Sequence, residues 1–197
     1  MWQGLVLEAK SLACERGGRL IFKNLDFAIA GGEMVELRGP NGAGKSSLLR
    51  LLAGLNTAAS GQLSFAGHED IATQAHYVGH MEAVKPALSV KQNLEFWARF
   101  LGGTADLAVF KLERLGADEA KFLSEGQRRR LALSRLVSVK RPLWLLDEPT
   151  VGLDQAALSD LRGAMEKHLA DGGLILAATH TALGLPKART LQIGASA

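Results

Sequence analysis

The chain has 197 residues, of which 47% are apolar and 22% charged, and its formal net charge is +3. This composition excludes an intrinsically disordered chain, and the length is typical of one domain, alone or with a small insert. The mild basic excess favours anionic partners such as nucleotides, membrane surfaces or nucleic acid. No run approaches the roughly 20 apolar residues that span a bilayer, so a role at a membrane would require a partner protein.

Cys14 is the only cysteine, which excludes an internal disulfide and is typical of a reducing compartment. Leu12-Ala13-Cys14 faintly resembles a lipoprotein processing site, but Glu8 and Lys10 interrupt the apolar segment that such a signal requires. We therefore expect Cys14 to be a small buried side chain of the core.

The first 38 residues predict a β-rich edge that precedes an α/β core. Short apolar runs alternate with glycine pairs at Gly17-Gly18 and Gly31-Gly32, a pattern typical of antiparallel strands and turns. The strand that follows, Glu33 to Arg38, leads directly into a glycine-rich loop.

Residues 39–47 read G-P-N-G-A-G-K-S-S and match the phosphate-binding pattern G-x-x-x-x-G-K-[ST]. Glycines let the backbone curl until several N–H groups point at one polyphosphate, and the helix after the loop adds its own N-terminal N–H groups. We expect Lys45 to bind the β- and γ-phosphates and Ser46 to offer a hydroxyl oxygen to Mg²⁺. The alternative, a chance glycine-rich turn, does not explain the strand before the loop and the helix after it. The predicted ATP-binding residues here are Gly39, Pro40, Asn41, Gly42, Ala43, Gly44, Lys45, Ser46 and Ser47.

The middle of the chain predicts a helical insert. A strand at Gly61–Gly67 and a strand end at Tyr77–His80 precede an amphipathic helix at Val90–Leu101, with Ser89 as its cap. Ala105–Leu115 is predicted as a second helix, and a third begins at Ser124 and runs to Leu136. Arg128–Arg130 could suggest nucleic acid, but no aromatic residue is interleaved for base stacking, so we favour a solvated helix face.

The last third alternates strands and helices, which predicts a mostly parallel sheet. Leu143–Leu146 is a fully apolar strand that ends at Asp147-Glu148, and Leu174–Ala178 is another that ends at Thr179-His180. Between them, Asp154 is expected to cap a helix at about Gln155–Leu169. A short helix and a strand near Thr190–Ile193 are expected at the end of the chain.

Parallel strands place their carboxyl ends at one edge of a sheet, so the glycine loop, Asp147-Glu148 and His180 are expected to converge. Asp147 can hold Mg²⁺, Glu148 can orient or deprotonate an attacking water, and His180 can hydrogen-bond a γ-phosphate. The alternatives are a helix-capping role for Asp147 and a plain surface charge for Glu148.

Leu123-Ser124-Glu125-Gly126-Gln127 closely resembles the L-S-G-G-Q signature of ABC (ATP-binding cassette) ATPases, and the matching order of motifs covers essentially the whole chain. The resemblance implies that Glu148 is the catalytic glutamate, that Val151–Asp154 is the D-loop and that His180 is the switch histidine. It implies one nucleotide-binding domain over residues 1–197. The implied fold is α/β, a P-loop NTPase core with a mostly parallel sheet, an N-terminal antiparallel β edge and a helical subdomain at about residues 81–138.

The same resemblance implies a homodimer that hydrolyses ATP with Mg²⁺. Two such domains pair head to tail and enclose two ATP molecules, each between the phosphate loop of one chain and the signature of the other. The residues expected to act in trans are Ser124, Gly126, Gln127 and Asp154.

Two positions depart from the family pattern. His80 stands where most members have a glutamine; since Mg²⁺ prefers oxygen ligands, we expect His80 to accept or relay a hydrogen bond in coupling rather than to hold the metal. Arg16 stands where most members stack an aromatic ring on adenine, and its guanidinium plane can stack on a base instead.

These departures narrow the family, and the chain resembles the ATP-binding subunits of cytochrome c maturation (haem export) complexes. The short motifs that carry this resemblance are Leu12–Gly17 with Leu20–Phe22, Tyr77–His80, Val84–Pro86 and Gln92–Leu94. That implies a peripheral protein on the cytoplasmic face of a bacterial inner membrane, with integral-membrane subunits docked on the helical subdomain, chiefly at Glu82–Phe100. Its ATPase would drive release of a haem-loaded chaperone, an indirect partner. The alternatives are the ATPase subunit of another small exporter and a soluble ATPase acting on nucleic acid or ribosomes. The second usually carries long inserts or paired cassettes, so no nucleic acid is expected.

Overall fold

A computed structural model describes residue 2 and residues 4–194 as two compact units. The core unit comprises the described residues up to Gly79, together with Pro142–Pro149 and those from Lys167 onward. The helical unit comprises His80–Arg141 and Thr150–Glu166.

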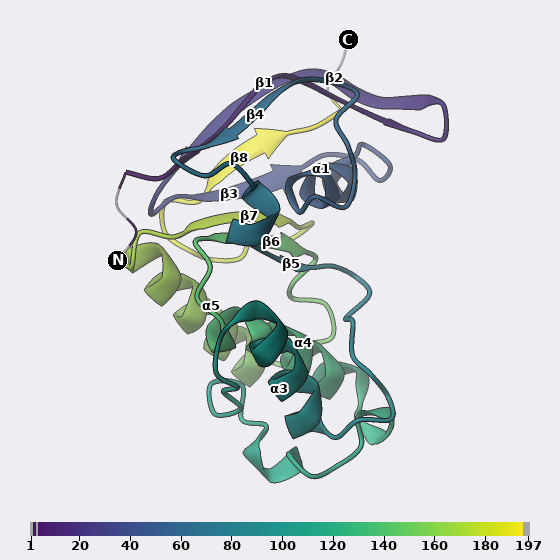
Figure 1. Ribbon diagram of the computed structural model, residues 1–197, viewed down its shortest axis with the longest axis vertical. Helices are drawn as coiled ribbons and strands as arrows, with labels where there is room; N and C mark the ends of the chain where they lie inside the picture. The colour runs from purple at the N-terminus through teal and green to yellow at the C-terminus, as the bar shows by residue number, and fades with distance from the viewer. Residues whose placement is uncertain (1, 3, 195–197) are drawn as a thin grey trace. The chain divides into compact units, whose positions relative to one another are not determined.

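The core unit contains two sheets (Figure 1). One is antiparallel with strand order β2-β1-β4, and the other is parallel with strand order β5-β6-β7-β3-β8. The strands are β1 (Val6–Arg16), β2 (Arg19–Ala30), β3 (Met34–Arg38), β4 (Ser60–Phe65), β5 (Ala75–Val78), β6 (Leu143–Asp147), β7 (Leu174–Ala178) and β8 (Arg189–Gln192). The predicted α/β fold, with a mostly parallel sheet and an antiparallel β edge, is confirmed.

Helix α1 (Lys45–Leu52) lies between the two sheets of the core unit (Figure 1). Its leucines repeat at helical spacing, so one apolar face meets the sheets. The buried core joins residues of both sheets and this helix, among them Leu7, Phe22, Leu48, Leu49, Leu145 and Leu176. Cys14 belongs to the same core and is only 1% exposed, as expected. A four-residue helix, α2 (Ile71–Gln74), was not predicted.

The segment between β7 and β8 corrects one expectation. A short helix was predicted there, but residues 181–188 contain only bends, turns and irregular backbone. Gly184 and Lys187 have φ angles of 74° and 67°, which a right-handed helix excludes, and Pro186 lacks an N–H to donate. The strand predicted near Thr190–Ile193 is present as β8.

The helical unit is built on α3 (Val90–Leu101), α4 (Glu125–Ser138) and most of α5 (Gln155–Ala170), which continues into the core unit. Two 3₁₀ turns, η1 (Glu113–Leu115) and η2 (Ala120–Phe122), lie between α3 and α4. Ser89 caps α3 as predicted, and its hydroxyl accepts from the Gln92 N–H at 3.1 Å. Ser124 caps α4 in the same way, accepting from Gln127 N–H at 3.2 Å.

The helix predicted at Ala105–Leu115 is wrong, because a turn at residues 108–111 interrupts it. The carboxylate of Asp106 accepts from the Ala108 N–H at 2.9 Å, as a helix cap does, but the Lys111 N–H then donates to the Ala108 carbonyl at 2.9 Å and closes the turn. Lys111 then has a φ of 54°, which a right-handed helix excludes. The buried side chains of Phe110 and Leu112 explain the apolar pattern without a helix.

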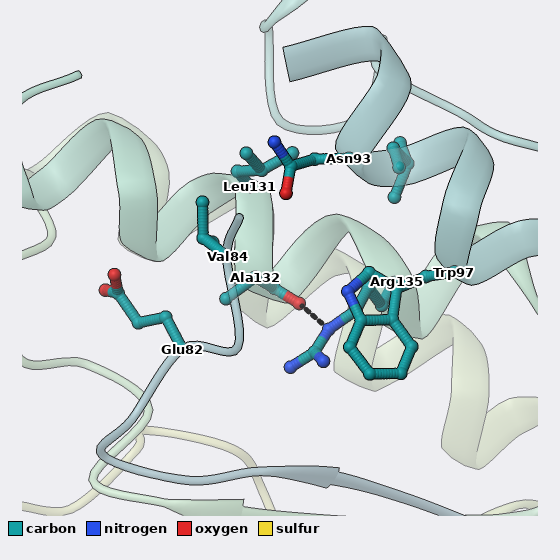
Figure 2. Close-up of a pocket in the computed structure, with 8 residues that line it drawn as sticks. Glu82, Val84, Asn93, Trp97, Leu131, Ala132 and Arg135 are labelled. Carbon is teal, nitrogen blue, oxygen red and sulfur yellow. Dashed lines mark hydrogen bonds between the residues drawn. The ribbon is translucent and has the colours of Figure 1, made fainter. Parts of the chain in front are cut away.

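The interior of the helical unit holds polar groups as well as apolar ones (Figure 2). The Arg135 guanidinium lies 4.9 Å from the ring centroid of Trp97, and its Nε donates to the Ala132 carbonyl at 3.0 Å. Burial, with nearby Arg129 in second place, lowers the pKa of Arg135 to about 10. Arg129 is itself only 4% exposed, so the expectation that Arg128–Arg130 form a solvated face is wrong for its middle residue.

Candidate functional site

Three strand ends meet at one edge of the parallel sheet. In the register of the sheet, Ala178 of β7 pairs with Leu37 of β3 on one side and with Asp147 of β6 on the other. The loop after β3, the acidic pair at the end of β6 and Thr179-His180 after β7 therefore emerge side by side. In open α/β sheets this edge is where ligands bind.

The loop at residues 39–47 curls around the amine of Lys45. The Lys45 Nζ donates to the carbonyl oxygens of Gly39 at 2.7 Å and Pro40 at 3.1 Å. Gly44 caps α1 with a φ of 102°, and a Cβ at this position would lie 2.6 Å from a methyl carbon of Ile21. Pro40, Asn41 and Gly42 are exposed. The loop is thus an open cradle of backbone groups with one cation at its base, at the start of a helix.

Glu148 combines an unusual backbone with a neighbouring imidazole. Its φ is 46°, and its N–H donates to the Ala178 carbonyl at 2.9 Å, which ties it to the end of β7. Its Oε1 lies 3.5 Å from Nε2 of His180. The His180 side chain is 56% exposed, so it can meet both this carboxylate and a ligand in solvent.

The oxygen donors at this edge fit Mg²⁺ better than a transition metal. Asp147 is 7% exposed and ends β6, and Ser46 lies in the first turn of α1. Among the residues that the structure describes, no three His, Cys, Asp or Glu side chains form a metal-binding cluster. One carboxylate and one hydroxyl, completed by phosphate oxygens and water, is the donor set that Mg²⁺ uses in nucleotide sites.

The two atypical positions lie in different surroundings. Arg16 is the exposed last residue of β1 and pairs with Arg19 across the hairpin turn. Strand β2 of this hairpin carries Ile21 and Phe22, whose side chains pack against Gly44. The hairpin therefore lies beside the phosphate loop. His80 is exposed, follows β5 and belongs to the helical unit.

The signature residues lie in the helical unit and not in the unit of the phosphate loop. The Ser124 N–H donates to Gln127 Oε1 at 2.8 Å, so this pair forms a reciprocal capping box at the start of α4. A Cβ on Gly126 would lie 2.6 Å from the Gly152 carbonyl, so the signature and the loop of residues 151–154 are in close contact. The Asp154 carboxylate accepts from the Ala157 N–H at 2.8 Å and caps α5 as expected.

Sequence reasoning missed Glu36, a buried carboxylate in β3 that is only 6% exposed. The available signal was a lone acidic residue between the apolar residues Val35 and Leu37. Its partners come from residues 38 and 183, which the sequence pattern did not connect.

Comparison with known proteins supports one family. A family model described as ABC transporter matches residues 22–151. A protein from Nitrobacter winogradskyi called cytochrome c biogenesis ATP-binding export protein CcmA is 51% identical, over 97% of this chain and 99% of that protein. The protein of the same name from Bradyrhizobium diazoefficiens is 52% identical, over 95% of this chain and 98% of its own length.

Solved structures share the fold at lower identity. A structure described as the ATP-binding subunit of an ABC transporter has a TM-score of 0.83 at 24% identity, covering 95% of this chain and 85% of that one. A dimeric ATP-binding cassette in a post-hydrolysis state, bound to ADP and Pi, has a TM-score of 0.77 at 23% identity, covering 89% and 88%.

Proposed function

The chain belongs to the ABC transporter family, and on that premise we propose that it is the ATP-hydrolysing subunit of a membrane complex for cytochrome c biogenesis. In this proposal its ATPase powers release of a haem-loaded chaperone. The observation that carries the ATPase site is the register at Ala178, which joins the phosphate loop, Asp147-Glu148 and His180 at one sheet edge. The assignment to cytochrome c biogenesis rests on the near-full-length likeness to the CcmA proteins.

In the proposed reaction the phosphates of ATP lie in the loop of residues 39–47. The Lys45 amine exchanges its carbonyl contacts for β- and γ-phosphate oxygens, and backbone N–H groups at the start of α1 bind the same anion. Glu148 orients the attacking water and accepts its proton, and His180 hydrogen-bonds the γ-phosphate. The 3.5 Å separation of Glu148 and His180 lets both side chains meet at the transferred group. Arg16 is proposed to stack on the base.

Mg²⁺ bound at Ser46 and Asp147 would neutralise charge on the phosphate oxygens. Both side chains offer oxygen, and Asp147 is held by the strand that carries it. His80 is proposed to act in coupling between the nucleotide site and a partner.

The site is proposed to be completed by a second copy of the chain. Ser124, Gly126, Gln127 and Asp154 all lie at the starts of helices α4 and α5, or within the capping residues that precede them. Helix N-termini attract phosphate, so these segments suit an ATP molecule held by the partner chain.

Among the residues that the structure describes, no helix is both long enough and apolar enough to cross a membrane.

We propose that the protein is attached to the cytoplasmic face of the bacterial inner membrane through integral-membrane subunits docked on the helical unit. The three exposed phenylalanines support this, because Phe96, Phe100 and Phe122 are 40%, 72% and 74% exposed and all belong to the helical unit. The four other phenylalanines of the chain are buried. Exposed aromatic side chains are enriched where proteins bind one another.

Affinity purification tests the proposal as a whole. Tagged Glu148→Gln protein would be trapped with ATP and Mg²⁺ in its native membranes, solubilised, and its companions identified. Recovery of integral-membrane subunits together with a haem-bearing chaperone is the expected result. Recovery of an unrelated permease would be compatible with the proposed ATPase activity but would overturn the proposed role in cytochrome c biogenesis.

Substitution of the exposed phenylalanines tests the docking face in the same experiment. Phe100→Ser should lose the membrane subunits and keep ATP binding. Leu55→Ser is the matched control, because Leu55 is 62% exposed in the core unit and should keep them.

A further inference from the structure

Glu36 is a buried carboxylate in the middle of β3. It lies in β3 between Val35 and Leu37, and its relative exposure is 6%. A buried carboxylate is strongly unfavourable unless charged or N–H partners replace its water. The two oxygens of Glu36 should therefore have specific partners.

Each oxygen of Glu36 meets a different segment. Oε2 accepts from the Arg38 guanidinium, at 2.6 Å from Nη2 and 3.2 Å from Nε. Oε1 accepts from the backbone N–H of Leu183 at 2.9 Å. Since Arg38 directly precedes Gly39, one carboxylate joins the start of the phosphate loop to the segment that follows β7.

That segment carries His180. It leaves β7 at Ala178, and its first turn is closed by Thr179, whose hydroxyl donates to the Thr181 carbonyl at 2.8 Å. Its far end is held by the Leu183 N–H on Glu36. His180 is thus the exposed tip of a short turn anchored at both sides, and that turn places the imidazole 3.5 Å from Glu148.

We propose that Glu36 is a positioning residue for ATP hydrolysis, which holds the His180 turn and the phosphate loop in one geometry through Leu183 and Arg38. The inference rests on the proposed role of His180. Glu36 does not touch the reacting atoms in this arrangement. It acts by limiting how far His180 can move from Glu148, and small displacements at such a site have large effects on rate.

Substitution at Glu36 with a conservative rescue tests the inference. Glu36→Met keeps an unbranched side chain of similar volume but cannot accept from Leu183 or Arg38, and it should lower kcat about tenfold with a much smaller change in KM for ATP. Glu36→Gln keeps an acceptor oxygen for Leu183 but loses the carboxylate contact with Arg38, so its kcat should return to within about threefold of wild type. Glu33→Ala is the matched control, since Glu33 is an exposed neighbour that contacts Ala30 and Arg189, and it should leave kcat unchanged.

Amide exchange at Leu183 supplies a readout besides activity. Glu36→Met should make this N–H exchange faster, and Glu36→Gln should leave it protected, because only the first variant removes the acceptor. Should Glu36→Met fail to fold, Arg38→Gln frees the other carboxylate oxygen and should lower kcat about threefold.

His180→Ala separates this inference from the proposed function. A fall in kcat for His180→Ala with normal kcat for Glu36→Met would overturn the positioning role alone. Normal kcat for His180→Ala would overturn the assignment of His180 and this inference with it. An equal loss of ATP affinity and turnover in Glu36→Met would also overturn it, because a positioning role acts on kcat.

Discussion

Replacing Glu148 by glycine should affect the stability of the protein and its ATPase activity in opposite ways. A φ of 46° costs a side chain with a Cβ about 1 kcal/mol, a cost that glycine avoids. The unfolding free energy of Glu148→Gly should therefore equal that of the wild type or exceed it by up to about 1 kcal/mol, while turnover falls about 100-fold or more for loss of the proposed general base. Urea unfolding and phosphate release on the same samples measure both. Glu148→Gln is the control, since it loses turnover but keeps the strained backbone. A clear loss of stability in Glu148→Gly would contradict the inference that the backbone of Glu148 is strained.

His168 should make the stability of the core unit depend on pH. Its imidazole stacks on Trp144 with 4.0 Å between ring centroids, meets the edge of Trp2, and lies 3.1 Å from the Pro142 carbonyl through Nε2. Burial lowers its pKa from 6.5 to about 4. The unfolded chain therefore binds the proton first, so stability is full above pH 6.5 and is lost as the pH falls towards 4.

The size of this pH effect can be measured against a variant. Between pH 7 and pH 5 the shift corresponds to about 2 kcal/mol of unfolding free energy. His168→Gln keeps an N–H donor but does not titrate, so its loss of stability over that range should be smaller by about this amount. Urea unfolding at the two pH values checks the prediction, and equal losses in both proteins would show that His168 titrates normally in the fold.

Structural features that depend on neighbours a few positions away could be predicted from the sequence. They include the strand and helix on either side of residues 39–44, the position of Asp147-Glu148 at the end of β6, and the serine caps Ser89 and Ser124. Glu36 could not, because its partner Leu183 is 147 positions away and follows no pattern. Burial of Arg129 was missed for a similar reason, since the packing of helices in the helical unit decides which face of α4 meets solvent.

Two matched helix caps allow structure and function to be separated at the scale of elements. Ser89 and Ser124 form the same capping box, in which the serine N–H donates to Oε1 of Gln92 at 2.9 Å and to Oε1 of Gln127 at 2.8 Å, respectively. Replacing either serine by alanine should cost about 1 kcal/mol of unfolding free energy. Only Ser124→Ala should also lower ATP turnover, by about tenfold or more, because that hydroxyl is proposed to face a phosphate. Comparable turnover losses in both variants would attribute the effect to capping alone.

Most helices and strands were predictable because their hydrophobic patterns are clear. The apolar runs of β6 and β7 and the glycine-bounded strands were correctly predicted as strands, with ends shifted by a few residues. The failures at Ala105–Leu115 and between β7 and β8 share one feature. In both segments the backbone adopts positive φ angles that a right-handed helix excludes, at Lys111 in the first and at Gly184 and Lys187 in the second.

At the scale of the whole molecule, the chain divides its chemistry between two units. The phosphate loop, Asp147, Glu148 and His180 belong to the core unit, and Ser124, Gly126, Gln127 and Asp154 belong to the helical unit. If each ATP site takes its core-unit residues from one chain and its helical-unit residues from the other, a chain defective in one unit and a chain defective in the other can together form an intact site.

Mixing two inactive variants tests this arrangement. Lys45→Ala removes the cation proposed to bind the phosphates, and Ser124→Arg blocks the signature, so each homodimer should lack turnover. In a mixed dimer, one of the two sites combines the intact loop of one chain with the intact signature of the other. An equimolar mixture should then recover up to about one quarter of wild-type turnover, since about half the dimers are mixed and each holds one intact site. Phosphate release against mixing ratio should peak at equal amounts. A mixture of Lys45→Ala with Glu148→Gln is the control: both changes lie in the core unit, so no complete site can form. No recovery at any ratio would contradict independent sites completed in trans.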